Sequence, residues 1–138
     1  MDSKGRIAFA LLILVQAAHS VEECVFRLFD VFAPARWVSG LVSADLAFGF
    51  GLANACIVLF GIWCYWARVR PSHPRARVYA WLWALVELGN GLSHIFFTLL
   101  RGEYFPGVGT APLLLATSCY MTYKLLRVTK QGDEVVSA

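Results

Sequence analysis

Four long apolar segments constrain the fold of this chain more than any other feature. Each is about as long as the roughly 20 residues that cross a ~30 Å hydrocarbon core as a helix. Of the 138 residues, 59% are hydrophobic and only 15% are charged, and the mean hydropathy is +0.62. This composition excludes a disordered chain, a coiled coil and an ordinary soluble domain. The segments are approximately residues 7–29, 46–67, 78–100 and 107–126.

These segments predict helices rather than the strands of a barrel. Backbone polar groups in lipid must be bonded within the segment, and the apolar residues run continuously instead of alternating with a period of two. We therefore expect an all-α, polytopic membrane protein built as a four-transmembrane-helix bundle. Residues 1–138 form a single transmembrane domain in this interpretation, with a mobile C-terminal tail at residues 131–138.

Lys and Arg gather at one end of the expected bundle. Because cytoplasmic loops are enriched in these residues, both termini and the turn at 71–74 are expected in the cytoplasm, as in a multi-pass protein of the cell (inner) membrane. The net charge of +3 is small and concentrated in these flanks, so we expect contact with the lipid bilayer and no nucleic acid binding. Nine of the twelve positive residues belong to this end: Lys4, Arg6, Arg68, Arg70, Arg75, Arg77, Lys124, Arg127 and Lys130.

The first segment also resembles a secretory signal peptide. Positive residues precede an apolar core, and small residues around Ala17 and Ala18 would place a cleavage site near Ser20, which would remove His19. We favour a retained helix, because the polar residues that follow have helical order. The segment 30–44 is too short and too broken to span a membrane, and we expect it to lie at the outer interface, where it can cover the polar residues from outside.

Polar residues in the first and third segments share one face of each expected helix. Measured from the cytoplasmic ends at ~1.5 Å per residue, His19 lies level with Asn90, and Glu22 and Glu23 lie level with His94. Each ionisable group at membrane depth costs about 2.5–3.5 kcal/mol, so we expect the cluster to be paired, metal-bound or hydrated. The two faces hold Gln16, His19, Glu23, Arg27 and Asp30, and Glu87, Asn90, His94, Thr98 and Arg101.

Imidazole and carboxylate groups in this cluster predict a metal centre. His19 and Glu22 are three residues apart and can reach one point beside their helix, and Glu23 can bridge a second ion or hold a ligand in place. These groups suit zinc, iron or manganese and do not choose among them, or between one and two ions. The expected metal ligands are His19, Glu22, Glu23, Glu87 and His94, of which Glu22, Glu23 and Glu87 are also the candidate catalytic residues.

Three further residues are expected to support these ligands. Asn90 can supply an oxygen ligand or an orienting hydrogen bond. Asn54 in the second segment lies at about the depth of His19, although helix packing is the simpler role for it. Tyr104 precedes a Pro–Gly turn on the outer side, where it can cover the site or anchor the loop at the interface.

Several functions are compatible with this pattern. A metal centre in the membrane can activate water or dioxygen, so the favoured hypothesis is a metal-dependent enzyme that acts on a lipid-like or otherwise apolar small molecule. The alternatives are a metal-free acid–base enzyme using Glu22 or Glu87, and a non-enzymatic protein that binds or transports protons, metal ions or a small ligand. The polar face can also be a structural network, or pair with a second copy of the chain or another membrane subunit.

Three separate sequence elements form a distinctive pattern over roughly residues 18–107. His19 to Glu23 match H-x-x-E-E, Tyr104 to Gly107 match Y-x-P-G, and His94 stands between them. Together they resemble the HXXEE-domain family of small integral membrane proteins. The resemblance implies a helical membrane fold and a site that includes these residues, but it implies no particular reaction.

Overall fold

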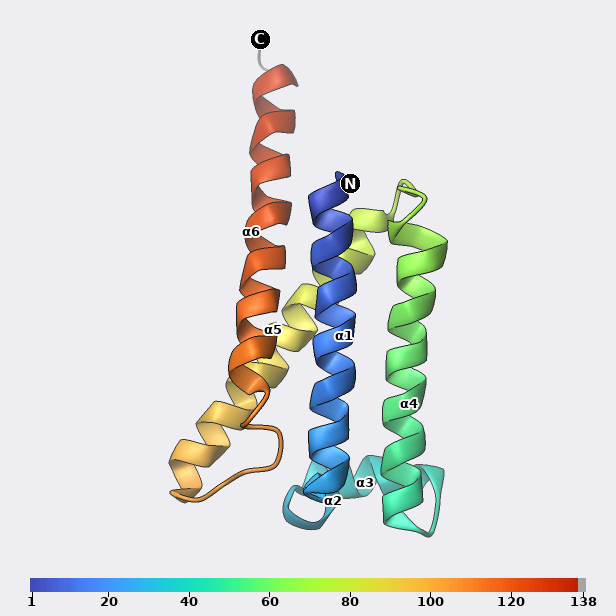
Figure 1. Ribbon diagram of the computed structural model, residues 1–138, viewed down its shortest axis with the longest axis vertical. Coiled ribbons are helices and arrows are strands. Elements are labelled where there is room, and N and C mark those ends of the chain that lie inside the picture. The colour runs from blue at the N-terminus through green and yellow to red at the C-terminus, as the bar shows by residue number, and fades with distance from the viewer. Residues whose placement is uncertain (137–138) are drawn as a thin grey trace.

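The computed structural model describes residues 1–136, and the side chains of residues 1–127, as a set of long helices (Figure 1). No strand occurs within residues 1–136, so the all-helical prediction is confirmed. The elements are α1 (Ser3–Val25), α2 (Leu28–Val31), α3 (Ala33–Val42), α4 (Leu46–Cys64), a π-helical turn η1 (Tyr65–Val69), α5 (Ala76–Arg101) and α6 (Ala111–Val136).

Three helices are long and apolar enough to cross a membrane. They cover residues Ser3–Val25, Leu46–Val69 and Ala76–Arg101. The predicted fourth span, 107–126, is shortened at its start because residues 102–110 form a loop, and α6 begins only at Ala111. A membrane bundle of four helices therefore stays a prediction, while three candidate spans are present in the described part of the chain.

Helix bounds differ from the predicted ones at both ends of the chain. α1 ends at Val25 rather than near residue 29, because Arg27 adopts a left-handed conformation with φ of 54° and turns the chain into α2. At the other end, α6 continues to Val136 through part of the predicted mobile tail. Residues 137 and 138 of that tail lie outside the described residues.

Both termini and the α4–α5 connection lie at one end of the molecule, and α2 and α3 lie at the other (Figure 1). Arg6 Nη1 donates a hydrogen bond to the carbonyl oxygen of Arg70 at 3.0 Å, and Lys124 lies 4.0 Å from Asp2. The positively charged flanks thus share one end, which is the arrangement that the predicted topology requires. Segment 30–44 does not span, as expected, and most of it forms α3 across the opposite end.

Two apolar clusters form the core, one toward each end of the bundle. The first contains Leu12 of α1 and Ala84 of α5, and the second contains Leu28, Phe50 and Phe105. Along α1 and α5 the buried polar residues lie between these clusters. The polar faces of the two helices therefore meet in the middle of the structure, with apolar packing on both sides.

Helix α3 crosses α4 in close contact at Gly49. A Cβ atom added to Gly49 would collide with the carbonyl oxygen of Ser39 and lie 3.0 Å from its carbonyl carbon. Ser39 is fully buried, and its hydroxyl donates to the Ala35 carbonyl at 2.6 Å, so the α3 backbone has little room to move. This contact fixes α3 across the end of the bundle, where it forms part of the cavity described below.

Gly49→Ala should therefore destabilise the protein. The added methyl group must push α3 away, and overpacking of this kind costs about 1–3 kcal/mol. Gly51→Ala is the matched control, because a Cβ at Gly51 meets nothing within 4 Å and Ala is favoured over Gly in a helix by roughly 0.5–1 kcal/mol. Thermal unfolding in detergent compares the two variants. Equal midpoints would contradict the close α3–α4 contact.

Candidate metal centre

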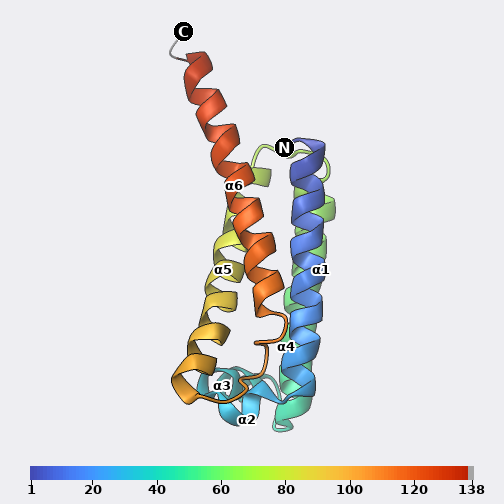
Figure 2. The ribbon, with the colours of Figure 1, turned by 60° about the vertical axis from the view of Figure 1, so that its left-hand side comes forward.

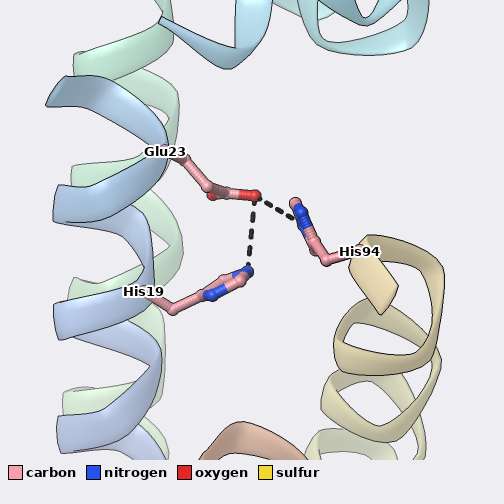
Figure 3. A group of neighbouring side chains, drawn as sticks. All are labelled: His19, Glu23 and His94. Carbon is pink, nitrogen blue, oxygen red and sulfur yellow. Dashed lines mark ion pairs between the residues drawn. The ribbon is translucent and has the colours of Figure 1, made fainter. Parts of the chain in front are cut away.

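His19 and Glu23 of α1 and His94 of α5 point toward one another (Figure 3). Glu23 Oε1 lies 3.0 Å from His94 Nε2 and 3.5 Å from His19 Nε2. One ligand atom from each residue lies within 4.8 Å of the others. The exposed fractions of the three residues are 0%, 6% and 3%. Two imidazoles and one carboxylate thus converge on one buried point.

Helix geometry and packing together place these three side chains. His19 and Glu23 are four residues apart and therefore lie on the same face of α1, one turn from each other. The two imidazole rings meet edge to face, with centroids 4.6 Å apart and an interplanar angle of 86°. Phe105 packs against the His94 ring with a centroid distance of 5.5 Å. Both rings are consequently held in position by their neighbours.

The hydrogen bonds of Thr110 define which nitrogen of His19 carries the proton. Thr110 Oγ1 donates its single proton to Glu22 Oε2 at 2.5 Å, and it lies 2.7 Å from His19 Nδ1. Because a hydroxyl has only one proton to donate, it must accept a hydrogen bond from His19 Nδ1. The neutral imidazole then carries its lone pair on Nε2, the atom that faces Glu23.

In this tautomer the lone pair of His19 Nε2 faces the Glu23 carboxylate, and a cation between them would remove the repulsion. His19 Nε2 is buried and has no hydrogen-bond partner, and a carboxylate oxygen of Glu23 lies 3.5 Å from it. A lone pair and a carboxylate that face each other repel unless a proton or a metal ion lies between them. A divalent metal fits this donor set, because imidazole nitrogen and carboxylate oxygen are ordinary ligands of zinc, iron and manganese.

Glu22, the other acid of the motif, has different partners. Its Oε1 accepts hydrogen bonds from the Tyr104 hydroxyl at 2.5 Å and the Gly109 N–H at 2.8 Å. Its Oε2 accepts from the Thr110 N–H at 2.7 Å and from the Thr110 hydroxyl. A carboxylate at the start of α6 also interacts favourably with the helix dipole. Glu22 therefore fastens the loop 102–110 to α1, and it lies outside the group of His19, Glu23 and His94.

Tyr104 completes this attachment from the exposed side. Its partial burial and its hydrogen bond to Glu22 raise the pKa of Tyr104 to about 12. The phenol therefore stays protonated and keeps donating to Glu22 throughout the neutral range. The predicted supporting role of Tyr104 takes the form of a contact with Glu22, which in turn reaches His19 through Thr110.

Gly107 lets the same loop lie directly on both imidazole rings. Its φ of +99° is a backbone conformation that residues other than glycine rarely adopt. A Cβ atom there would lie 2.5 Å from His94 Nδ1 and 2.9 Å from His19 Cε1. The glycine of Y-x-P-G is thus required both by the backbone conformation and by the close approach to the two histidines.

Glu87, Asn90 and Asn54 lie beside the centre rather than in it. Glu87 is buried against the Gln16 amide, and Asn90 Nδ2 lies 3.4 Å from Glu87 Oε2. Asn54 Oδ1 accepts a hydrogen bond from the Ser20 hydroxyl at 2.8 Å. Of the predicted ligands, the structure brings together His19, Glu23 and His94, and it gives Glu22 and Glu87 other partners.

The sequence did not predict Thr110 or Gly109 as residues of the site. Both contact Glu22, and Thr110 also contacts His19. Thr110 directly precedes the apolar run of α6, a position where Ser and Thr are common as helix caps. That signal indicates the start of a helix, but the partner of the hydroxyl depends on how the loop returns to α1.

A cavity of about 360 Å³ adjoins the centre. Glu23 and His94 form part of its wall, together with side chains from α1, α3, α4 and α5. Its volume falls within the range of small-molecule sites, roughly 300–1,000 Å³. The open side of the candidate metal centre therefore faces a space that can hold a ligand.

A family model described as "Protein of unknown function with HXXEE motif" matches residues 10–122. The chain belongs to this HXXEE family. The match includes the three converging residues and the loop that covers them. Comparisons with curated proteins and with solved structures gave no significant match. Membership thus confirms the resemblance seen in the sequence.

Gly107→Ala should open the loop that covers the histidines. The added methyl group meets both rings, so the loop must move, and such overpacking costs about 1–3 kcal/mol in addition to the backbone strain. Gly102→Ala is the control, because Gly102 also has a positive φ, of 66°, but a Cβ there meets nothing within 4 Å. Thermal unfolding in detergent should rank Gly107→Ala clearly below Gly102→Ala. The reverse order would contradict the close packing of the loop on the rings.

The raised pKa of Tyr104 predicts an alkaline dependence of stability. The pKa of about 12 in the folded protein lies above the unfolded value of about 10. The stabilisation is therefore fully present below pH 10 and is lost as the pH rises through 12. Wild type should be more stable than Tyr104→Phe at neutral pH, and the difference should shrink above pH 10. A difference that does not change with pH would show that the phenol does not bond Glu22.

Proposed function

We propose that this HXXEE protein is an integral membrane protein that binds one divalent metal ion at His19, Glu23 and His94. One observation carries the proposal: two imidazoles and a carboxylate, all buried, converge within 4.8 Å, and the unpartnered Nε2 of His19 faces the carboxylate. Two His and one carboxylate form the ligand set of many catalytic zinc sites and of non-haem iron oxygenases. In both classes the metal keeps an open position for water, dioxygen or substrate.

The proposed activity is metal-dependent chemistry on a lipid-like or otherwise apolar small molecule. A bound metal would supply Lewis acidity or activate water or dioxygen. The protein's own residues would orient the ligands, since Glu22 acts on His19 through the Thr110 hydroxyl and thereby fixes its tautomer. The cavity beside Glu23 and His94 would hold the substrate, and its mainly apolar wall suits a molecule that comes from the bilayer.

We further propose that α6 joins the three candidate spans as a fourth membrane helix, with both termini in the cytoplasm. Support comes from the shared position of the two termini and the α4–α5 connection (Figure 2), and from the positive residues that the sequence places in these segments. The loop over the histidines then lies toward the outer side of the cell membrane. A reporter fused after Ala138 should read cytoplasmic, and an outer location would contradict this topology.

A metal-free site is the second candidate, and the short Glu23–His94 contact favours it. At 3.0 Å, a proton on His94 Nε2 is donated in a hydrogen bond to the Glu23 carboxylate. Such a pair can exchange protons with a ligand in the cavity, as an acid–base enzyme or as a carrier of protons or small ligands. A measurement of bound metal separates the two candidates.

Wild-type protein purified in detergent without chelators should contain stoichiometric zinc, iron or manganese, measured by inductively coupled plasma mass spectrometry. His19→Ala, His94→Ala and Glu23→Gln should each lose the metal, because each removes one of three ligands. The helices should still insert, since removing a buried polar group does not hinder insertion. His73→Ala is the control: this histidine lies in the α4–α5 connection, 3.2 Å from Arg68, and its loss should leave the metal bound.

Glu22→Gln sharpens the same experiment. Glu22 acts on the centre only through Thr110 and the loop, so its loss should weaken metal affinity by about 10–100-fold rather than abolish binding. Wild-type protein that contains no metal, and gains none from added zinc, iron or manganese, would contradict the metal site and favour the metal-free candidate.

A further inference from the structure

The cavity beside the candidate metal centre has one polar wall and one apolar wall. The polar wall consists of Gln16, Glu23, Asn54, Asn90, Ser93 and His94 from α1, α4 and α5. The apolar wall includes Phe32, Val38, Phe50 and Ile57 from the α2–α3 end and from α4. A ligand that fills this space must therefore be amphiphilic, with its polar group toward Glu23 and His94.

The cavity lies between two candidate membrane spans, because residues of both α4 and α5 line it. The two helices α4 and α5 are close together at their connection and diverge toward the α2–α3 end (Figures 1 and 2). Ile57 of α4, which lines the cavity, is 45% exposed. A second, wholly apolar hollow of about 220 Å³ shares Ile57 and continues between Phe60 of α4 and Val86 of α5. An apolar chain can therefore run from the cavity past Ile57 along the lipid-facing side.

A chain of hydrogen bonds lies behind the polar wall, around the carboxyl group of Glu87. One amide atom of Gln16 lies 2.6 Å from Glu87 Oε2, and the other lies 3.1 Å from Ser20 Oγ. Ser20 Oγ donates its only proton to Asn54 Oδ1 at 2.8 Å, and Asn54 Nδ2 donates to the Phe50 carbonyl at 3.2 Å. Because the Ser20 hydroxyl donates its single proton to Asn54, it can only accept a hydrogen bond from Gln16. The Gln16 atom beside it is then the NH₂ group.

The Gln16 carbonyl oxygen therefore faces Glu87 at 2.6 Å. Two acceptors at this distance require a proton between them, and 2.6 Å is typical of an O–H···O bond and short for N–H···O. The opposite orientation of the Gln16 amide would give Glu87 a donor, but it would require two protons from the Ser20 hydroxyl. With the amide nitrogen of Gln16 directed at Ser20, Glu87 is a carboxylic acid that donates to the Gln16 carbonyl oxygen.

The charges around the cavity then sum to zero. With a divalent metal in place, its two positive charges are balanced by the carboxylates of Glu23 and Glu22. Asn54, Asn90, Ser93 and Gln16 are neutral, and so is Glu87. A charged head group would add an uncompensated charge at membrane depth, which costs free energy.

We propose that this cavity binds a single-chain lipid with an uncharged polar head, such as an alcohol, aldehyde or ester, taken directly from the bilayer. The head lies at the polar wall and the chain passes Ile57 into the second hollow. A volume of about 360 Å³ is near the lower end for ligand sites and too small for a two-chain phospholipid. The proposal rests on the proposed function in one respect, the divalent metal that balances Glu22 and Glu23.

Photo-crosslinking in lipid nanodiscs tests this ligand class. A diazirine-bearing analogue of hexadecanol should label residues of α4 and α5 around the cavity, mapped by mass spectrometry. Unlabelled hexadecanol should compete at least about tenfold better than palmitate or hexadecyltrimethylammonium, since only the last two bring a charge. Equal competition by palmitate or the ammonium compound, or labelling spread evenly over the apolar surface, would overturn the proposal.

Ile57→Trp and Leu59→Trp form a matched pair of variants. Both positions are exposed apolar residues of α4, but only Ile57 lies where the two hollows meet. Ile57→Trp should reduce labelling about tenfold by blocking the chain, as overpacking does, and Leu59→Trp should not. The same effect of both variants, or of neither, would contradict the proposed path.

Infrared spectroscopy and metal analysis complete the test. Wild type at neutral pH should show the carbonyl stretch of a protonated carboxylic acid, and Glu87→Gln, a neutral replacement of the same shape, should lack it and retain labelling. Absence of this band in wild type would show that Glu87 is charged and would overturn the uncharged head group. Metal content, measured on the same samples, keeps the two proposals distinct. Bound metal without alcohol labelling contradicts only the ligand. Selective labelling without metal contradicts the metal centre and the charge balance drawn from it, and leaves the ligand class standing.

Discussion

The Glu22 carboxylate organises the site through four hydrogen bonds to the loop before α6. Because Glu22 lies on α1 and its donors lie in residues 104–110, these bonds join the first helix to the last across most of the sequence. They also fix the Thr110 proton, and through it the tautomer of His19. The position of the loop over the histidines and the lone pair of His19 both depend on this carboxylate.

The two acids of H-x-x-E-E have separate tasks because of helix geometry. Adjacent residues on a helix point about 100° apart, so one face cannot use both carboxylates in the same way. Glu23, four residues from His19, faces His94, while Glu22 faces the loop. The Y-x-P-G motif contacts both parts of H-x-x-E-E. Tyr104 donates a hydrogen bond to Glu22, and Gly107, which has no side chain, lets the loop lie on the imidazoles. The two short motifs are therefore parts of one structure.

Much of the fold and the central juxtaposition could be predicted from the sequence. Continuous apolar segments predict helices, and three of the four expected spans are helices long and apolar enough to cross a membrane. Helical periodicity and depth place Glu23 level with His94, and the structure puts these side chains in contact. Both predictions rest on regular geometry, which repeats along the chain and needs no knowledge of loops.

The remaining details depend on tertiary contacts that periodicity cannot supply. The left-handed Arg27 ends α1 early, and the return of residues 102–110 to α1 delays the start of α6. Sequence spacing groups Glu22 and Glu87 with the metal ligands because it gives their faces and depths. It does not show that Thr110 and Gly109 form hydrogen bonds with Glu22, or that the Gln16 amide contacts Glu87.

X-ray absorption spectroscopy on metal-loaded protein tests the central claim most directly. If His19, Glu23 and His94 hold the ion, the zinc-loaded protein should show the multiple scattering of two imidazoles, with Zn–N distances of about 2.0–2.1 Å and at least one oxygen ligand. His94→Ala should lose one imidazole contribution. A coordination sphere with sulfur ligands, or one of oxygen alone, would contradict the His–Glu–His centre.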